Sequence, residues 1–183
     1  MIRARRLEAD DLPARVQWFN SPAVYEQMAI DAPLSLSGTR QWYTSAVLSD
    51  RRRDFTFEDV SQVGRLVAMG GLTDISRQHG HAELYIVVNP ELHGRGFGSA
   101  AVRWLCNYGF IQLGLHRIYL HTMGFNDGAR RLYERLGFVS EGMLRQHTMH
   151  HGHYVDRFVH GLLRTEWANQ SWAASRPLRL EQS

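Results

Sequence analysis

Three closely spaced glycines, Gly94, Gly96 and Gly98, precede a stretch with the apolar periodicity of a helix. Glycine has no Cβ, so the backbone of such a loop can approach a ligand closely. The helix that follows would direct its unpaired N–H groups and the positive end of its dipole toward the same place. Arg95 adds a positive charge within the loop. This arrangement predicts a site for an anionic ligand such as a phosphate; a ligand-free turn between a strand and a helix is the alternative.

Two nucleotide-binding motifs do not account for this loop. A P-loop requires Gly-Lys-Ser/Thr at a fixed spacing after the first glycine, and that lysine is missing. Residues 96–101 do match the G-x-G-x-x-A pattern of a dinucleotide-binding fold. That fold also needs an acidic residue about 20 positions later to bind the ribose, and no Asp or Glu occurs between Gly98 and Asp127. An acyl-coenzyme A is the third kind of nucleotide ligand to weigh for this loop.

The glycine loop and a second motif together resemble one protein family. Residues 93–98 align with the signature Q/R-x-x-G-x-G/A of the GNAT superfamily of acetyl-CoA-dependent N-acetyltransferases, with His93 where the signature has Gln or Arg. The second motif follows at the family's distance and consists of Asn126, Ala129, Tyr133, Gly137 and Phe138. The chain is similar to this superfamily over residues 65–167.

Three further stretches resemble the branch that holds the spermidine N-acetyltransferases and the ribosomal-protein N-terminal acetyltransferases. They are residues 115–121, residues 137–142 and the Gly-x-Tyr-x-Asp element at residues 152–156. The resemblance implies transfer of acetyl from acetyl-CoA, the co-substrate, to a primary amine of a small molecule or peptide by direct attack of the amine, with a polyamine-type acceptor slightly favoured. Protein N-termini, aminoglycoside-like antibiotics and amino sugars are alternative acceptors, and a module that binds acyl-CoA without turnover is a further alternative.

Tyr133 is the candidate for the general acid. Amide formation from a thioester requires a proton for the departing thiolate. Tyr133 lies on the apolar stripe of a predicted helix together with Leu132 and Leu136. The family's matching tyrosine stands near the cofactor sulfur as general acid, and the resemblance implies that role here. A tyrosine that only packs in the core is the alternative that periodicity alone favours.

Glu83 is the candidate for the general base, because the reaction needs a neutral amine. It interrupts an otherwise apolar strand just before the glycine loop, where a carboxylate could take the ammonium proton directly or through water. The superfamily often places a glutamate there. In an alternating strand, Glu83 could equally face outward. Glu26 and Asp31 are the other acidic residues that could line a polyamine pocket.

The resemblance also implies which residues bind acetyl-CoA. The family separates the strand at residues 81–88 from the next one, so main-chain N–H groups near residues 86–88 would polarise the thioester carbonyl. Asn126 would meet the pantetheine or phosphate arm, although by sequence alone it is a good helix N-cap. The predicted cofactor-binding residues are Ile86, Val87, Val88, His93, Gly94, Arg95, Gly96, Phe97, Gly98, Ser99, Asn126, Ala129 and Tyr133.

Metal and thiol chemistry are not favoured. His147, His150, His151 and His153 invite a zinc hypothesis, but no cysteine or second carboxylate is placed to complete a ligand set. We predict no metal site. The histidines of this hairpin are expected to be solvated or to line the substrate pocket. Cys106 falls on an apolar helix face and is interpreted as a buried thiol rather than a nucleophile.

The elements that must position these residues follow from periodicity and turn residues. Strands are predicted at residues 2–8, 54–60, 65–75, 81–88, 117–123, 138–149 and 154–164. Helices are predicted to begin near Asp10, Ser21 and Ser37 and to span residues 99–113 and 126–136, the last closed by Gly137. The tail from residue 166 is expected to be polar and frayed. The predicted fold class is α+β, the GNAT fold, with a mixed and mostly antiparallel central sheet flanked by helices.

Length and composition limit the remaining classes of protein. The chain has 183 residues, 44% hydrophobic and 21% charged, which fits a globular chain and excludes disorder and collagen-like repeats. We predict one acetyltransferase domain over residues 1–170 and a polar tail over residues 171–183. The net charge of +3 is weak for a protein that binds nucleic acid, so no such partner is expected.

A single cysteine, and the lack of a signal-peptide pattern or a long apolar run, predict a cytoplasmic protein that does not bind membranes. An exposed sheet edge would allow a homo-oligomer.

Overall fold

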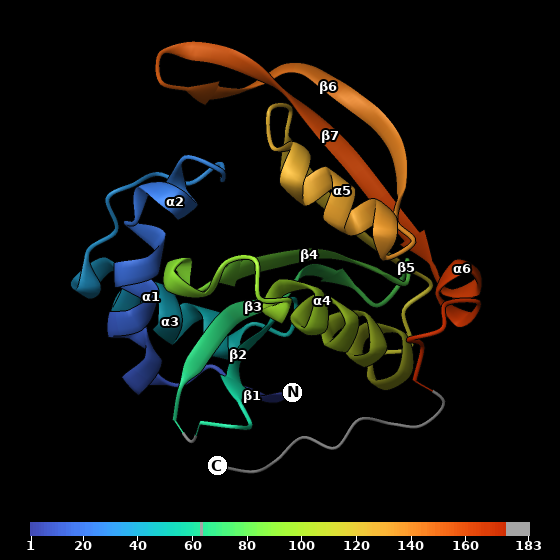
Figure 1. The fold of residues 1–183 in the computed structure, drawn as a ribbon, viewed down its shortest axis with the longest axis horizontal. Coiled ribbons are helices and arrows are strands. Elements are labelled where there is room, and N and C mark those ends of the chain that lie inside the picture. Colours follow the sequence, from blue (N-terminus) through green and yellow to red (C-terminus); the bar gives the residue numbers. More distant parts are fainter. Residues whose placement is uncertain (63, 175–183) are drawn as a thin grey trace.

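A seven-stranded sheet runs through the part of the chain that the computed structural model describes, residues 1–62 and 64–174. Its strands are β1 (Ile2–Arg6), β2 (Arg53–Asp59), β3 (Leu66–Ser76), β4 (His81–Val88), β5 (Arg117–Met123), β6 (Val139–His150) and β7 (His153–Leu163). They lie in the order β1-β2-β3-β4-β5-β7-β6 (Figure 1), and all neighbours are antiparallel except β4 and β5. The predicted α+β class with a mixed, mostly antiparallel sheet is confirmed.

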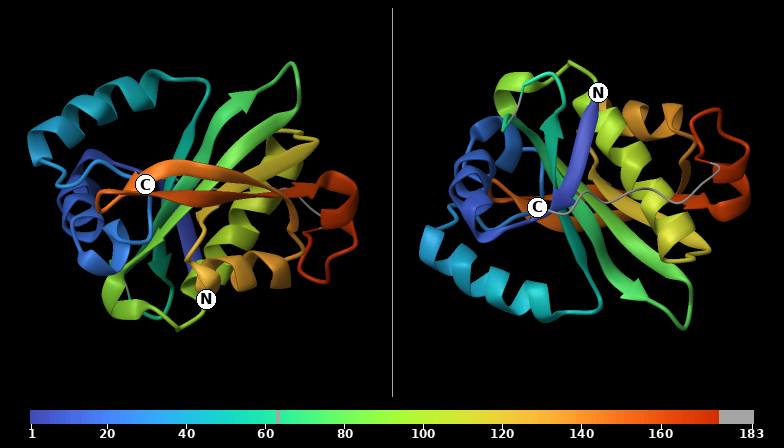
Figure 2. Two further views of the ribbon diagram at one scale, coloured as in Figure 1. Left: turned by 90° about the horizontal axis from the view of Figure 1, so that it is seen from above. Right: turned by 90° about the horizontal axis from the view of Figure 1, so that it is seen from below.

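Helices cover both faces of this sheet. They are α1 (Leu12–Phe19), α2 (Pro22–Tyr25), α3 (Leu36–Leu48), α4 (Phe97–Asn107), α5 (Asp127–Arg135) and α6 (Arg164–Ala168), with short 3-10 turns at Ala9–Asp11 and Pro90–Leu92 and a π-helical segment at Tyr108–Gln112. Figure 2 shows α1 and α3 on one side of strands β2 to β4 and α4 on the other. Ser35, rather than Ser37, caps α3, because its Oγ accepts a hydrogen bond from the Gly38 N–H at 3.0 Å.

Separate apolar cores lie on the two faces of the sheet. On one face, α4 packs against β2, and the ring of Phe55 meets the rings of Trp104 and Tyr108 edge-on with centroids 4.8 Å apart in both pairs. On the other face, Trp18 of α1 packs against Val87 of β4 and its neighbours. Leu84 of β4 lies in the first core and Val87 in the second, so this strand is packed on both faces, and the candidate site depends on it.

The parallel ladder between β4 and β5 is short. It runs from His81 opposite Arg117 to Glu83 opposite Tyr119 and stops there. Among the described strands, the rest of β4 up to Val88 pairs only with β3. Backbone groups on the β5 side of residues 84–88 are therefore left open to a ligand. The predicted separation of the two strands is confirmed, and it opens the sheet where the glycine loop begins.

Strands β6 and β7 form a long hairpin that arches over α5 (Figure 1). The two predicted strands are confirmed, and the turn between them uses His151 and Gly152, both with positive φ. Strand β6 is an edge strand of the described sheet, and most of its residues are exposed. None of the helices that the structure describes is long and apolar enough to cross a membrane.

The chain beyond residue 166 is more ordered than the sequence predicts. Trp167 of α6 is only 8% exposed, and its Nε1 donates a 2.8 Å hydrogen bond to Oδ1 of Asn107. Trp172 and Ala173 also pack against the core. The prediction of a frayed tail from residue 166 is therefore wrong for this stretch, because an indole that buries its ring and pairs its N–H is stabilised like any core residue. The remainder of the predicted tail, residues 175–183, lies outside the described residues, and the domain boundary at residue 170 stays a prediction.

Candidate active site

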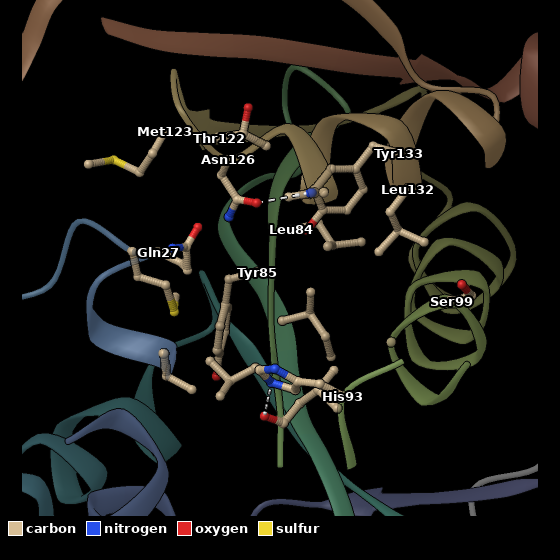
Figure 3. A pocket seen from close by; sticks show the side chains of 18 of the residues that line it. Gln27, Leu84, Tyr85, His93, Ser99, Thr122, Met123, Asn126, Leu132 and Tyr133 are labelled. Atoms are coloured by element: carbon tan, nitrogen blue, oxygen red, sulfur yellow. Dashed lines mark hydrogen bonds between the residues drawn. The ribbon is translucent and has the colours of Figure 1, made fainter. Parts of the chain in front are cut away.

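A cavity of about 740 Å³ opens where β4 and β5 separate (Figure 3). Its wall is built from residues 23–29 at α2, residues 83–88 of β4, the loop at residues 92–99, and residues between 121 and 135 at the end of β5 and in α5. All the predicted site residues except Arg95 lie on this wall. Arg95 is exposed and lies outside it. The structure thus brings together residues 23–29, 83–99 and 121–135 and Arg157, which are far apart in the sequence.

The glycine loop has an open backbone. Gly94 and Gly96 have φ angles of +77° and +82°, and no described atom lies within 4 Å of a Cβ built on either residue. Gly96 is the N-cap of α4, so the first N–H groups of that helix are available to a ligand at the loop. A Cβ at Gly98 would lie 3.1 Å from Cγ2 of Val88, which explains why a small residue is needed there. The cradle fits a phosphate group.

Two polar side chains form hydrogen bonds that stabilise the loops bordering the cavity. His93, which replaces the usual Gln or Arg, places its Nε2 3.2 Å from the carbonyl oxygen of Val88 and so ties the loop to the end of β4. Asn126 accepts a 3.0 Å hydrogen bond from the Ala129 N–H, which confirms its function as the N-cap of α5. A contact between Asn126 and a cofactor stays a prediction.

Tyr133 both packs in the core and lines the cavity. It projects from α5, is 7% exposed, and its ring meets that of Phe138 edge-on at a centroid distance of 5.6 Å. Burial, with a smaller contribution from the Cys106 thiol, raises the pKa of Tyr133. The hydroxyl therefore stays protonated at neutral pH and can donate a proton.

Glu83 and His121 form a hydrogen-bonded pair on the wall of the same cavity. Nδ1 of His121 lies 2.7 Å from Oε1 of Glu83, and their side chains are 19% and 31% exposed. Glu83 is therefore not an outward residue of an alternating strand. His121 was not among the predicted site residues. The alternation of Arg117, Tyr119 and His121 on one face of β5 could have signalled it, once β5 is placed beside β4.

The wall away from the glycine loop comes from the N-terminal third of the chain and from β5. Figure 3 shows Gln27 and Met123 on the side of the cavity away from Ser99. The hydroxyl of Tyr85 donates a hydrogen bond to the carboxylate of Asp54. Burial, with a smaller effect of the Asp54 charge, raises the pKa of Tyr85, so it remains neutral. Gln27, Met123 and Tyr85 were not predicted as site residues. For Gln27, nothing local marks the N-terminal helices as part of the pocket.

The three acidic candidates for a polyamine pocket do not converge. Glu83 lines the main cavity together with Arg157 of β7. Asp31 instead lines a second cavity of about 720 Å³, which borders the tip of the β6–β7 hairpin, and Glu26 lies on neither of these two walls. Within residues 1–62 and 64–174, no three His, Cys, Asp or Glu side chains are close enough together to hold a metal ion.

Comparison with known proteins decides the family. The family described as "Acetyltransferase (GNAT) domain" matches residues 2–139. The chain belongs to the GNAT acetyltransferase family. A spermidine N(1)-acetyltransferase of Vibrio cholerae is 32% identical to this GNAT protein over 154 residues, which are 84% of this chain and 82% of that one. A putative ribosomal N-acetyltransferase of Bacillus subtilis is 28% identical over 135 residues, 70% of this chain and 73% of that one.

Solved structures agree with this assignment. The crystal structure of spermidine N-acetyltransferase from Vibrio cholerae in complex with CoA and spermine is 30% identical to this GNAT protein, with a TM-score of 0.86. The match covers 92% of this chain and 98% of that one. The resemblance seen in the motifs is thereby confirmed: this GNAT protein is an N-acetyltransferase that uses acetyl-CoA as its co-substrate.

Proposed function

We propose that this enzyme acetylates a primary amine of a polyamine, with Tyr133 as the general acid and Glu83 at the proton-accepting end of the site. The observation that carries the proposal is that Tyr133 and the Glu83–His121 pair line one cavity, which the glycine loop borders. The polyamine class is supported by the relatives, among them the spermidine N(1)-acetyltransferase of Vibrio cholerae.

Acetyl-CoA binds, in this proposal, between the glycine loop and the open side of β4. The N–H groups at the start of α4 hold its phosphates, and the main-chain groups of residues 86–88 that face away from β3 pair with the pantetheine arm and the thioester carbonyl. When bound, acetyl-CoA supplies a thioester carbonyl that the neutral amine attacks, so that a C–N bond forms as the C–S bond breaks.

Tyr133 donates its hydroxyl proton to the departing sulfur. Burial raises the pKa of Tyr133, so its hydroxyl carries a proton at neutral pH, and its place on the cavity wall puts that proton within the site. The proton that the new amide nitrogen loses then restores the hydroxyl. At the other end of the cavity, the hydrogen-bonded Glu83–His121 pair provides groups that can accept the proton of the incoming ammonium.

An acceptor that also carries a carboxylate, such as a peptide with an acidic side chain, is the second candidate. Arg157 favours it: this arginine lines the cavity, and among the described residues it takes part in no ion pair. A guanidinium in that position would repel a polycation and attract a carboxylate. The relationship to a putative ribosomal N-acetyltransferase is compatible with a peptide acceptor.

Thiol release in the presence of matched acceptors tests the proposal. The purified enzyme is titrated calorimetrically with acetyl-CoA and then assayed with spermidine, neutral and acidic short peptides, and an aminoglycoside. Saturable CoA release with spermidine is expected. Release only with the acidic peptide would establish the second candidate, and binding of acetyl-CoA without release from any acceptor would indicate a module that binds acyl-CoA without turnover.

Two wider properties are also proposed. The exposed edge of β6 offers unpaired backbone groups for self-association, which light scattering on the purified enzyme would measure. A cytoplasmic location is proposed from the use of acetyl-CoA and from the single buried cysteine, and fractionation of the source cells would test it.

A further inference from the structure

The Glu83–His121 pair lies at the point where two parallel strands stop pairing. The ladder between β4 and β5 ends with Glu83 opposite Tyr119. His121 is the next residue of β5 on the same face, and its ring reaches back to the carboxylate of the neighbouring strand at 2.7 Å. Both side chains line the cavity. The pair is therefore held at the mouth of the opening in the sheet.

The carboxylate fixes which nitrogen of His121 carries a proton. An ionised carboxylate only accepts hydrogen bonds, so Nδ1 of His121 must be the donor to Glu83. In the neutral imidazole, this leaves the lone pair on Nε2, for which the described residues provide no hydrogen-bond partner. The ring is also supported by Tyr119, whose ring it meets edge-on at a centroid distance of 5.8 Å. Tyr119 in turn donates a 3.1 Å hydrogen bond to Asp74.

We propose that Nε2 of His121 is the atom that takes the proton from the acceptor ammonium, and that Glu83 is the positioning residue that orients the imidazole. This inference rests on the proposed function of the same cavity. The N–H bond of the ammonium breaks, its electron pair stays on the nitrogen for attack, and the proton forms a bond to Nε2 and later passes to solvent. The imidazolium so formed lies beside the carboxylate of Glu83, which stabilises it.

Protonation of Glu83 itself is the competing arrangement, and the geometry favours it less. A proton on Nε2 converts the hydrogen bond into an ion pair at 2.7 Å, whereas a proton on Glu83 removes the only carboxylate charge on the described cavity wall. The charged and titratable groups around His121 are Glu83 on β4, Tyr119 on its own strand, and Arg157 and His160 on β7.

The substitution His121→Asn separates the two arrangements. The Asn amide can still donate to Glu83, but it has no basic nitrogen. With spermidine as acceptor, we expect kcat to fall about 100-fold at neutral pH and the loss to shrink as the pH rises, because neutral amine becomes more abundant without an enzymic base. The KM for acetyl-CoA and the thermal stability should not change. His81→Asn is the matched control, since His81 lies on the same sheet face but outside the cavity wall, and it should keep native activity.

Glu83→Gln and the double variant complete the test. A positioning role predicts a smaller loss for Glu83→Gln than for His121→Asn, and no further loss in the double variant. A larger loss for Glu83→Gln, or a His121→Asn loss that is the same at every pH, would overturn the proposal. In ligand-free enzyme, ¹⁵N NMR should show the neutral His121 ring protonated at Nδ1, with the resonance assigned by its absence in His121→Asn. Protonation at Nε2 instead would refute the proposal, whatever the acceptor.

Discussion

Arg5 of β1 forms a bidentate ion pair with Asp11. Nη1 and Nη2 each donate a 2.7 Å hydrogen bond to a different carboxylate oxygen, while Nε donates to Glu58 of β2 at 2.7 Å. Asp11 is 3% exposed and also accepts hydrogen bonds from the Glu8 N–H and the Thr56 hydroxyl, both at 2.9 Å. These contacts join the start of α1 to the first two strands, on the face of the sheet that carries the N-terminal wall of the cavity.

The stability of the fold should therefore depend on the charge of Asp11. Burial alone would raise the pKa of Asp11, but its hydrogen bonds from Arg5, Glu8 and Thr56 outweigh burial and lower it. Because its pKa is lowered, charged Asp11 contributes fully to the free energy of unfolding above the ordinary pKa of an aspartate. This contribution is lost as the pH falls through the lowered pKa. Asp11→Asn should lose about 3 kcal/mol of unfolding free energy at neutral pH.

Urea unfolding at several pH values measures this effect. The difference between the native protein and Asp11→Asn should be largest at neutral pH and fade in acid. Asp10→Asn is the control, because Asp10 is the exposed neighbour and should cost little. A difference that persists unchanged at acid pH would show that the charge of Asp11 does not matter.

Tyr133→Phe should lower kcat about 100-fold, because it removes the proton for the leaving thiolate and keeps the ring. The affinity for acetyl-CoA, measured by calorimetry, should stay within about twofold. Tyr108→Phe is a matched control: Tyr108 is also 7% exposed, but it stacks on Trp104 away from the cavity wall. Equal activity of the two variants would show that the hydroxyl of Tyr133 is not the general acid.

Gly96→Ala should weaken acetyl-CoA binding by at least about tenfold, because a methyl group would enter the open cradle at the start of α4. It should also cost about 1 kcal/mol of stability, since φ at Gly96 is +82°. Gly114→Ala carries a similar strain, with φ at +67° and open space around it, but lies outside the cavity. Calorimetry should show lost affinity only for Gly96→Ala; similar affinities in both variants would mean that the cradle does not hold the co-substrate.

Cys106 should be unreactive in the folded enzyme. It is fully buried, and burial raises the pKa of its thiol, which keeps the reactive thiolate scarce at neutral pH. Alkylation followed by mass spectrometry should label the unfolded chain but not the native one, and Cys106→Ala should retain activity. Rapid labelling of the native enzyme would contradict the buried position of the thiol.

The parts of the site that follow from local sequence could be predicted. The backbone of Gly94 and Gly96, the N-cap Asn126 and the inward position of Tyr133 each depend on residues within one or two turns of the chain. Periodicity and capping are local properties, so one sequence is enough to place them.

The rest of the site depends on contacts between distant segments. His121 meets Glu83 only because β5 lies parallel to β4 in one register, and Gln27 reaches the cavity only through the packing of the N-terminal helices. The order of Trp167 depends in the same way on Asn107, which is 60 residues away. Polar composition led to the prediction of a frayed end, whereas one buried indole with its paired N–H decides the outcome.

The direct product of the reaction tests the central claim. The enzyme is incubated with spermidine and acetyl-CoA that carries an isotopic label in its acetyl group, and the amines and the protein are then analysed by mass spectrometry, with Tyr133→Phe in parallel. The proposed function predicts one labelled acetyl group in an amide on a primary amine of spermidine, formed in amounts equal to the CoA released and far more slowly by the variant. Labelled acetate or labelled protein in place of acetylated spermidine would contradict it.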